Sequence, residues 1–227
     1  MKWGSERVRT GPWRGDRQVA YLNPVADAPA PSAAFVRQCL QQLAARGYRR
    51  VLTGALSPSE SHGLLAAGFE VHEQLHLLAH DLTRIPEIGP APLRRTGRGE
   101  ETAVLHVDRQ AFPPFWRLDP SSLRDAIHAT PQARYRVADD GAVVGYTITG
   151  RAGRRGYVQR LAVDPSYGGL GLGTALVVDG LRWLRRWRVD QAVVNTQLDN
   201  GRALALYERI GFRRQPAGLA VLSADLP

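Results

Sequence analysis

The sequence is poor in several residue types, and each scarcity excludes a class of protein. Cys39 is the single cysteine among 227 residues, which excludes an internal disulfide framework and a thiolate metal cluster. No apolar run approaches the roughly 20 residues that a membrane-spanning helix needs. Residues 1–17 lack the apolar stretch of a secretory signal. From these absences we expect a cytoplasmic protein with no membrane partner and no bound metal.

Lysine is also scarce, although the chain is strongly basic. Lys2 is the only lysine among 30 basic residues, and the formal net charge is +9. Such a balance favours anionic partners: nucleic acid, a phosphate-bearing cofactor or acidic lipid. No block of about five consecutive basic residues is present, as an interaction tail would have. We therefore do not expect nucleic acid as the partner.

Two segments of the chain repeat one order of expected elements. Residues 35–82 read as helix, strand, helix and strand, and residues 175–226 follow the same order. Gly68 in the first segment aligns with Gly211 in the second. We interpret the segments as two related α/β halves, the first truncated and the second complete.

The stretch between the halves is rich in proline, arginine and glycine, as linkers are. We therefore expect a partial domain at residues 1–83, a linker at 84–99 and a catalytic domain at 100–227. The first domain is expected to begin with a strand over 17–22. The remaining expected elements are helices over 101–111 and 121–129, the latter capped by Ser121 or Ser122, and strands over 133–138, 142–149 and 157–163.

A glycine-rich turn follows the strand over 157–163 and is the most informative stretch. It contains Gly168, Gly169, Gly171 and Gly173, and a helix with apolar residues at positions i, i+4 and i+7 follows it. Glycines let backbone N–H groups approach an anion closely, and a helix N-terminus attracts negative charge. The arrangement therefore predicts a pyrophosphate site, with a turn that binds no ligand as the alternative.

Other phosphate-binding motifs do not fit this turn. No Lys-Ser or Lys-Thr pair follows the glycines, so the turn is not a Walker A loop. The glycine spacing is not G-x-G-x-x-G, so it is not a dinucleotide fingerprint.

The segment LAVDPSYGGLGLGTAL resembles the acyl-CoA loop of the GNAT N-acetyltransferase superfamily, whose signature is Arg/Gln-x-x-Gly-x-Gly/Ala. Residues 168–173 occupy that signature, with Gly168 where the family has Arg or Gln. About 27 residues after the loop, LDNGRALALYERIGF resembles the family's closing motif, Asn-x-x-Ala-x-x-Leu-Tyr-x-x-x-Gly-Phe. The resemblance covers about Arg94–Leu226 and implies a GNAT-like mixed-sheet fold. The first half resembles only the family's C-terminal portion and has no glycine-rich loop, and the tandem layout resembles that of double-domain members.

The resemblance implies acetyl-CoA as acyl donor, lying where the strands over 157–163 and 191–196 splay apart. Backbone groups of the first strand would bond the pantetheine arm and polarise the thioester carbonyl. The turn would hold the pyrophosphate, and Asn200 would cap the last helix. The implied cofactor-binding residues are Leu161, Ala162, Val163, Gly168, Gly169, Leu170, Gly171, Leu172, Gly173, Thr174, Asn200 and Tyr207.

The same resemblance makes Tyr207 the catalytic residue, a general acid that protonates the departing CoA thiolate. The alternative is that Tyr207 only packs under the sheet. The family's glutamate base falls at Asn195, which cannot act as a base. Asp199, Asp119 or Gln159, the last by positioning a water, are the alternatives for that step.

The acceptor pocket of this family implies a substrate-binding role for Phe112, Phe115 and Trp116, and packing between two helices is the alternative. Three histidines spaced by four residues lie on an expected strand, which predicts one solvated face rather than a metal site. They are His72, His76 and His80. Arginines 182, 185, 186 and 188 are expected on a solvated helix face, with nucleic acid or the CoA 3′-phosphate as alternatives.

Together these patterns predict an N-acetyltransferase. It would transfer acetyl from acetyl-CoA to the primary amine of a protein, peptide or small molecule by direct attack in a ternary complex. The alternative is a non-catalytic module on the same scaffold that senses CoA or binds nucleic acid or a partner. A monomer or a homodimer is expected.

Overall fold

The computed structural model describes residues 1–25 and 28–227, and these form two compact units. The first unit comprises residues 1–77, 195–200 and 215–227, and the second comprises 78–194 and 201–214. The unit boundaries therefore differ from the expected ones, because strands late in the chain pair with strands early in it.

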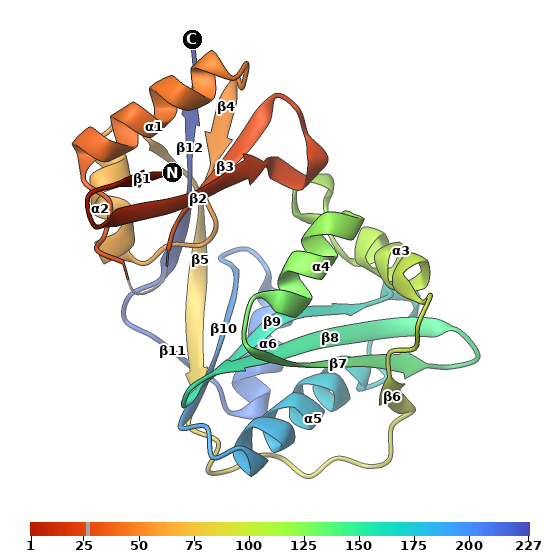
Figure 1. Ribbon diagram of the computed structural model, residues 1–227. Coiled ribbons are helices and arrows are strands. Elements are labelled where there is room, and N and C mark those ends of the chain that lie inside the picture. The colour runs from red at the N-terminus through yellow and green to blue at the C-terminus, as the bar shows by residue number, and fades with distance from the viewer. Residues whose placement is uncertain (26–27) are drawn as a thin grey trace. The chain divides into compact units, whose positions relative to one another are not determined.

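The first unit has a mostly antiparallel sheet in the strand order β1-β2-β3-β4-β12-β5 (Figure 1). The strands β3 and β4 run parallel. The strand β12 lies between β4 and β5, with Ala224 opposite Val51 and Leu219 opposite Leu75. The strands are β1 (Lys2–Trp3), β2 (Glu6–Pro12), β3 (Val19–Pro24), β4 (Arg50–Leu52), β5 (Glu70–His80) and β12 (Leu219–Asp225).

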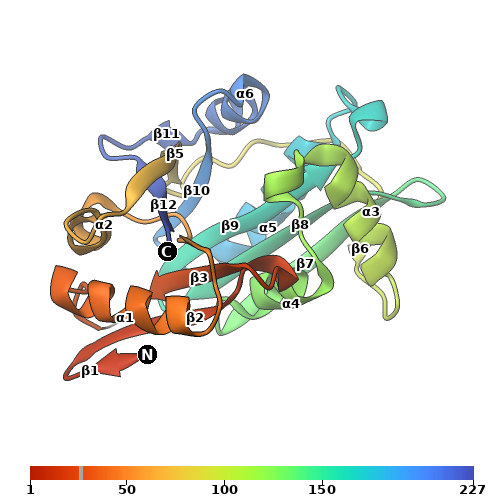
Figure 2. The ribbon, with the colours of Figure 1, turned by 90° about the horizontal axis from the view of Figure 1, so that it is seen from above.

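Two helices, α1 (Ala33–Ala45) and α2 (Pro58–Leu65), pack next to each other in this unit (Figure 2). The hydroxyl of Ser32 accepts a hydrogen bond from the Phe35 amide at 3.3 Å, which caps α1. The buried face of α1 meets residues of β3, β4 and β12 in one apolar core. A short 3₁₀ turn, η1 (Trp13–Gly15), precedes β3.

The second unit has a mixed sheet in the order β10-β9-β8-β7-β6, in which β9 and β10 are parallel. A short strand, β11, pairs with the last residues of β5. The strands are β6 (Leu93–Arg95), β7 (Gln132–Asp139), β8 (Val143–Ala152), β9 (Arg155–Val163), β10 (Gln191–Gln197) and β11 (Arg213–Arg214). The residues Asn195–Gln197 at the end of β10 are assigned to the first unit.

Helices cover both faces of the second sheet (Figure 1). On one face, α3 and α4 pack on the side chains of Tyr146 and Ile148. On the other face, α5 approaches so closely that a Cβ at Gly156 would lie 2.5 Å from Leu184. The helical segments are α3 (Glu101–Ala111), η2 (Pro114–Trp116), α4 (Pro120–His128), η3 (Pro165–Tyr167), α5 (Leu172–Arg186) and α6 (Gly201–Ile210).

The expected elements around residues 101–163 are confirmed to within a few residues, with one expectation wrong and two features not foreseen. Asp119, and not Ser121 or Ser122, caps α4, since its Oδ1 accepts a hydrogen bond from the Ser122 amide at 2.8 Å. The strands β1 and β2 were not expected at all. The segment expected as a linker contains β6, which pairs with β7.

An arginine fixes β6 in place. The Nε of Arg94 donates to Asp139 at 2.6 Å, and its guanidinium also donates to Glu100 at 2.8 Å. The hydrogen bonds that Glu100 accepts from Arg94 and from the Gly97 amide lower its pKa to about 2. The composition of 84–99 predicted a linker because this partner, Asp139, is distant in sequence.

The order helix, strand, helix, strand is present in both expected halves, as α1, β4, α2, β5 and as α5, β10, α6 with β11 and β12. That the first half is a truncated copy of the second stays a prediction. None of the helices in the described part of the chain is long and apolar enough to cross a membrane.

Candidate functional site

The two parallel strands of the second unit separate after a short ladder. Their register consists of three pairs and ends where Val193 lies opposite Tyr157. On its other edge β9 stays paired with β8 as far as Val163, with Gln159 as an extra residue between the pairs Ile148–Arg160 and Thr149–Val158. Such a bulge bends and twists a strand. The edge of β9 after Tyr157 therefore has no registered β10 partner within the described part of this unit, and its backbone groups can bind a ligand.

The strand β9 leads directly into the glycine-rich turn. Asp164 caps η3 by accepting a hydrogen bond from the Ser166 amide at 2.9 Å, and hydrogen bonds from Ser166 lower the pKa of Asp164. The helix α5 begins at Leu172 with Gly171 at its N-cap. No acidic residue lies in the first turn of α5, so nothing there competes with an anion for the unpaired amides of the helix N-terminus.

The four glycines of the turn serve two different purposes. Gly169 and Gly171 have φ angles of +83° and +79° and open space around them, so they are needed for their left-handed backbone. Gly168 and Gly173 instead leave room for side chains of α6 that lie against them. A Cβ at Gly173 would lie 2.9 Å from Cδ1 of Leu206, and one at Gly168 would collide with the guanidinium of Arg202.

Tyr207 is buried on α6, with 5% of its surface exposed. Its ring meets Phe212 at a centroid distance of 5.6 Å. Burial raises the pKa of the Tyr207 hydroxyl above its ordinary value, and the charge of Arg160 opposes this rise. The hydroxyl therefore stays protonated at neutral pH, as a proton donor must. A tyrosine that only packs under the sheet would have the same surroundings, so the catalytic role of Tyr207 stays a prediction.

Asn200 directly precedes α6, at the position expected of a cap. Its backbone N–H donates to the Gln197 carbonyl at 3.2 Å, which closes the turn after β10.

A buried ion pair joins the middle of the second sheet to α3. The carboxylate of Asp108, which is fully buried, accepts from Tyr146 Oη at 2.5 Å and from Arg160 Nε at 2.8 Å. Its other oxygen accepts from the Leu118 amide at 2.7 Å. This cluster was not predicted. The sequence feature that could have revealed the cluster is an acidic residue on the apolar face of α3, four positions after Val104.

The same arginine holds the aromatic segment expected to line the acceptor pocket. Arg160 donates from Nη2 to the Trp116 carbonyl at 2.7 Å, and its guanidinium carbon lies 3.5 Å from the centre of the Phe112 ring. Phe115 and Trp116 stack edge to face at 5.1 Å. All three aromatic side chains are half-buried. The structure thus brings Phe112, Phe115 and Trp116 together beside β9, although substrate binding by them stays a prediction.

The alternatives for the general base occupy different surroundings. Asp119 is engaged as the α4 cap, and although burial raises its pKa, hydrogen bonds from Ser122 and Ser121 produce a net lowering. Asp199 lies in an exposed turn, and Asn195 is exposed. Gln159 is the bulge residue; its Oε1 is buried and has no hydrogen-bond partner in the described residues. An unpaired acceptor of this kind suits a bound water.

One further expectation is changed by the structure, and another agrees with it. His80 does not lie on a solvated face: it is 2% exposed, its Nδ1 accepts from the Leu82 amide at 2.8 Å, and its ring packs on Phe212. Arg185 and Arg186 lie at the C-terminal end of α5, about 20 Å from its N-terminus at a rise of about 1.5 Å per residue. Both side chains are exposed, as expected of a solvated helix face, and they lie far from the diphosphate position in the turn. A contact with the CoA 3′-phosphate stays an alternative.

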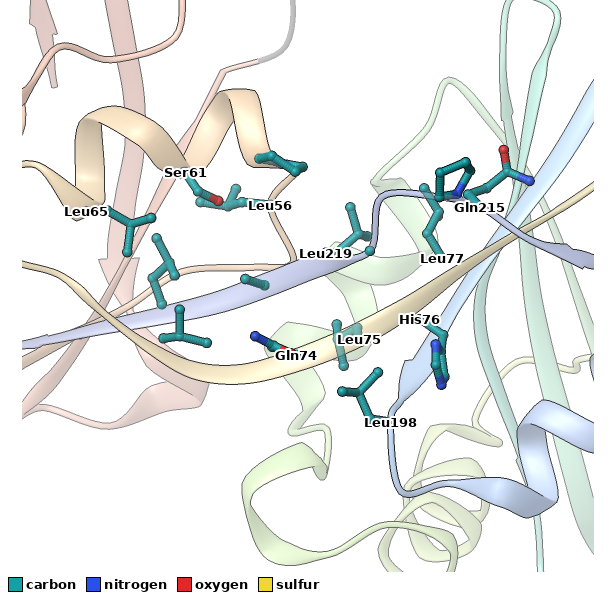
Figure 3. A pocket seen from close by; sticks show the side chains of 16 residues that line it. Leu56, Ser61, Leu65, Gln74, Leu75, His76, Leu77, Leu198, Gln215 and Leu219 are labelled. Atoms are coloured by element: carbon teal, nitrogen blue, oxygen red, sulfur yellow. The ribbon is translucent and has the colours of Figure 1, made fainter.

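A hollow of about 410 Å³ lies in the first unit, between α2, β5 and β12 (Figure 3). Its lining is mostly apolar and includes Leu65, Val71 and Leu198, each more than 40% exposed. Ser61 and His76 are among its polar residues. The volume suits a small molecule, but none of the residues predicted from the sequence to bind a cofactor or substrate lines it.

Residues 102–212 match the model of the Acetyltransferase (GNAT) family. This part of the chain belongs to the GNAT family. The match spans the strand separation, the glycine-rich turn and α6, so the GNAT domain contains every predicted cofactor-binding residue. The expected α/β fold with a mixed sheet is confirmed, since solved GNAT structures share it. A tandem GNAT protein from the clavulanic acid biosynthesis pathway superposes with a TM-score of 0.67 at 16% identity, covering 92% of this chain and 75% of that one.

Curated relatives are similar over most of the sequence. The mycothiol acetyltransferase of Amycolatopsis mediterranei is 30% identical over 202 residues, covering 78% of this chain and 65% of its own length. The human N-alpha-acetyltransferase 30 is 30% identical over 182 residues, covering 70% of this chain and 50% of its own. The chain thus spans between half and two thirds of the length of these two relatives.

Proposed function

We propose that this protein transfers an acetyl group from acetyl-CoA to a primary amine by direct attack in a ternary complex. The observation that carries the proposal is the continuous path from the unpaired edge of β9, through the turn at Gly169 and Gly171, to the N-terminus of α5. The edge would hold the pantetheine arm through Leu161 and Val163, and the turn would hold the diphosphate. Acetyl-CoA is a substrate here, and its thioester supplies the acyl group.

The proposed chemistry uses groups already positioned on β9 and α6. A backbone N–H on the free edge of β9 would polarise the thioester carbonyl as an oxyanion-type donor. Tyr207 would protonate the departing thiolate, which suits a buried hydroxyl whose pKa is raised. A water held at the Gln159 bulge would take the amine proton and relay it through further waters to solvent.

The acceptor is proposed only as a class. The relatives are named mycothiol acetyltransferase and N-alpha-acetyltransferase 30, so a first panel would contain a small amine and a peptide with a free N-terminus. The half-buried rings of Phe112, Phe115 and Trp116 favour acceptors with an apolar group next to the amine.

The first test is calorimetric titration with acetyl-CoA of the wild type and of the variants Gly171→Asp and Gly141→Asp. Gly141 is a matched control, because it has the same φ of +79° and the same open surroundings but lies in the β7–β8 turn. We expect binding by the wild type and the control and a loss for Gly171→Asp, where a carboxylate would repel the diphosphate. If both variants lost acetyl-CoA binding equally, backbone strain would explain the loss. That result would contradict a diphosphate site at Gly171.

The second test separates catalysis from binding. For Tyr207→Phe we expect a fall in turnover, measured as CoA thiol release with the amine panel, while the Kd for acetyl-CoA is kept. Unchanged turnover would refute the general-acid role. Acetyl-CoA binding by the wild type without thiol release for any amine would favour a CoA-sensing module.

A further inference from the structure

The glycine-rich turn contains no cationic side chain. Residues 164–174 include no lysine, arginine or histidine, and Gly168 stands where the GNAT signature carries Arg or Gln. A diphosphate in this turn would therefore meet backbone amides and hydroxyl groups but no positive charge from its own segment. Asp164, the acid of the turn, already accepts hydrogen bonds from Ser166.

A cation reaches the turn from another element. Arg202 lies in the first turn of α6, and the space that a side chain at Gly168 would enter is filled by its guanidinium, whose Cζ is 3.2 Å from the Cβ position. Leu206, one helical turn further along α6, packs on Gly173 at the start of α5. The contact between Leu206 and Gly173 therefore fixes the rotation of α6 about its axis. Arg202 lies on the same face of the helix and so points toward the turn.

The guanidinium of Arg202 is available to a ligand. The residue is exposed, and no carboxylate of the described residues forms an ion pair with it. An arginine beside unpaired amides can donate two hydrogen bonds to a phosphate group. Gly168 leaves room for this arrangement, because a side chain there would have to push the guanidinium aside.

We propose that Arg202 is a diphosphate-binding residue that supplies, from α6, the cationic contact that the turn lacks at Gly168. This inference rests on the proposed function, since it assigns a residue to the same acetyl-CoA site. It also assigns Gly168 a role: the glycine makes room for a cation that comes from elsewhere in the chain.

The test compares Arg202→Ala with Arg209→Ala by calorimetric titration with acetyl-CoA. Arg209 is a matched control, since it is an exposed arginine on the same helix and its loss changes the net charge equally. We expect Arg202→Ala to weaken binding about ten- to a hundredfold, the range of a charge-assisted hydrogen bond, and Arg209→Ala to change it less than threefold. The dependence of Kd on salt should also become shallower for Arg202→Ala.

Two more measurements link the effect to phosphate. The ratio of kcat/KM for acetyl-CoA to that for S-acetylpantetheine, which has no diphosphate, should fall in Arg202→Ala, and a general disturbance of the fold would not change this ratio. The double variant Gly168→Arg with Arg202→Ala should regain most of the lost affinity, because a cation again occupies the same space.

The outcomes separate this inference from the proposed function. If the wild type binds acetyl-CoA and the two arginine variants bind equally well, the role of Arg202 is overturned while the proposed function stands. If the wild type does not bind acetyl-CoA, both are overturned. A changed ratio together with recovery in the double variant supports the inference.

Discussion

The buried ion pair between Asp108 and Arg160 should be the most sensitive point of the second unit. In Asp108→Asn the carboxylate is lost, while Arg160, with 12% of its side chain exposed, keeps its charge. Removing one partner of a buried pair costs about 3–5 kcal/mol, because the other charge stays buried without compensation. Native proteins have about 5–15 kcal/mol of stability in total. At about 2–4 °C per kcal/mol for a chain of this size, we expect a fall in melting temperature of about 6–20 °C.

The assay is thermal unfolding followed by circular dichroism, with hydrogen exchange of the β8 and β9 amides to locate the effect. The control is the double variant Asp108→Leu with Arg160→Met, which removes both charges and keeps apolar volume. This variant should recover at least half of the stability lost in Asp108→Asn, since hydrophobic replacement of a buried ion pair often leaves stability unchanged. Exposed ion pairs typically contribute less than about 1 kcal/mol. If Asp108→Asn lowered the free energy of unfolding by no more than this, the result would refute the reasoning. So would a double variant that is less stable than the single one.

Two further predictions concern single titratable side chains. Burial lowers the pKa of His80 from 6.5, so below about pH 6.5 the unfolded chain binds a proton that the folded chain does not, and stability falls as the pH decreases. Between pH 7 and 5 the wild type should lose more stability than His80→Phe in urea titrations, and parallel pH profiles would contradict this. Burial raises the pKa of the Cys39 thiol to about 11, so a disulfide reagent at pH 8 should label Cys39 only after the first unit opens. Rapid labelling of the native protein would show that the α1 core is not closed.

The elements around the turn could be predicted from the sequence because their signals are local. The helix over 101–111 and the glycine-rich turn depend on periodicity, caps and backbone freedom within a few residues. The resemblance to the GNAT family then assigned the turn to acetyl-CoA, and the family match confirms the family.

The contacts that hold the site together could not be predicted in the same way. Arg160 meets Asp108, which is 52 residues away in sequence, and Arg202 meets Gly168 from another helix. Such pairs depend on how elements pack, which local patterns do not encode. The buried surroundings of His80 have the same origin, since its ring is covered by Phe212 from beyond α6.

The place of β12 between β4 and β5 has a consequence for synthesis of the protein on the ribosome. Leu75 and Leu219 lie opposite each other, so about 140 residues are translated after β5 before its partner exists. At about 5–20 residues per second this delay is on the order of 10–30 s. During this time β4 and β5 present unpaired edges, which are templates for aggregation. Expression yield should therefore depend on translation speed and on chaperones that shield nascent chains, even though the finished sheet closes this gap.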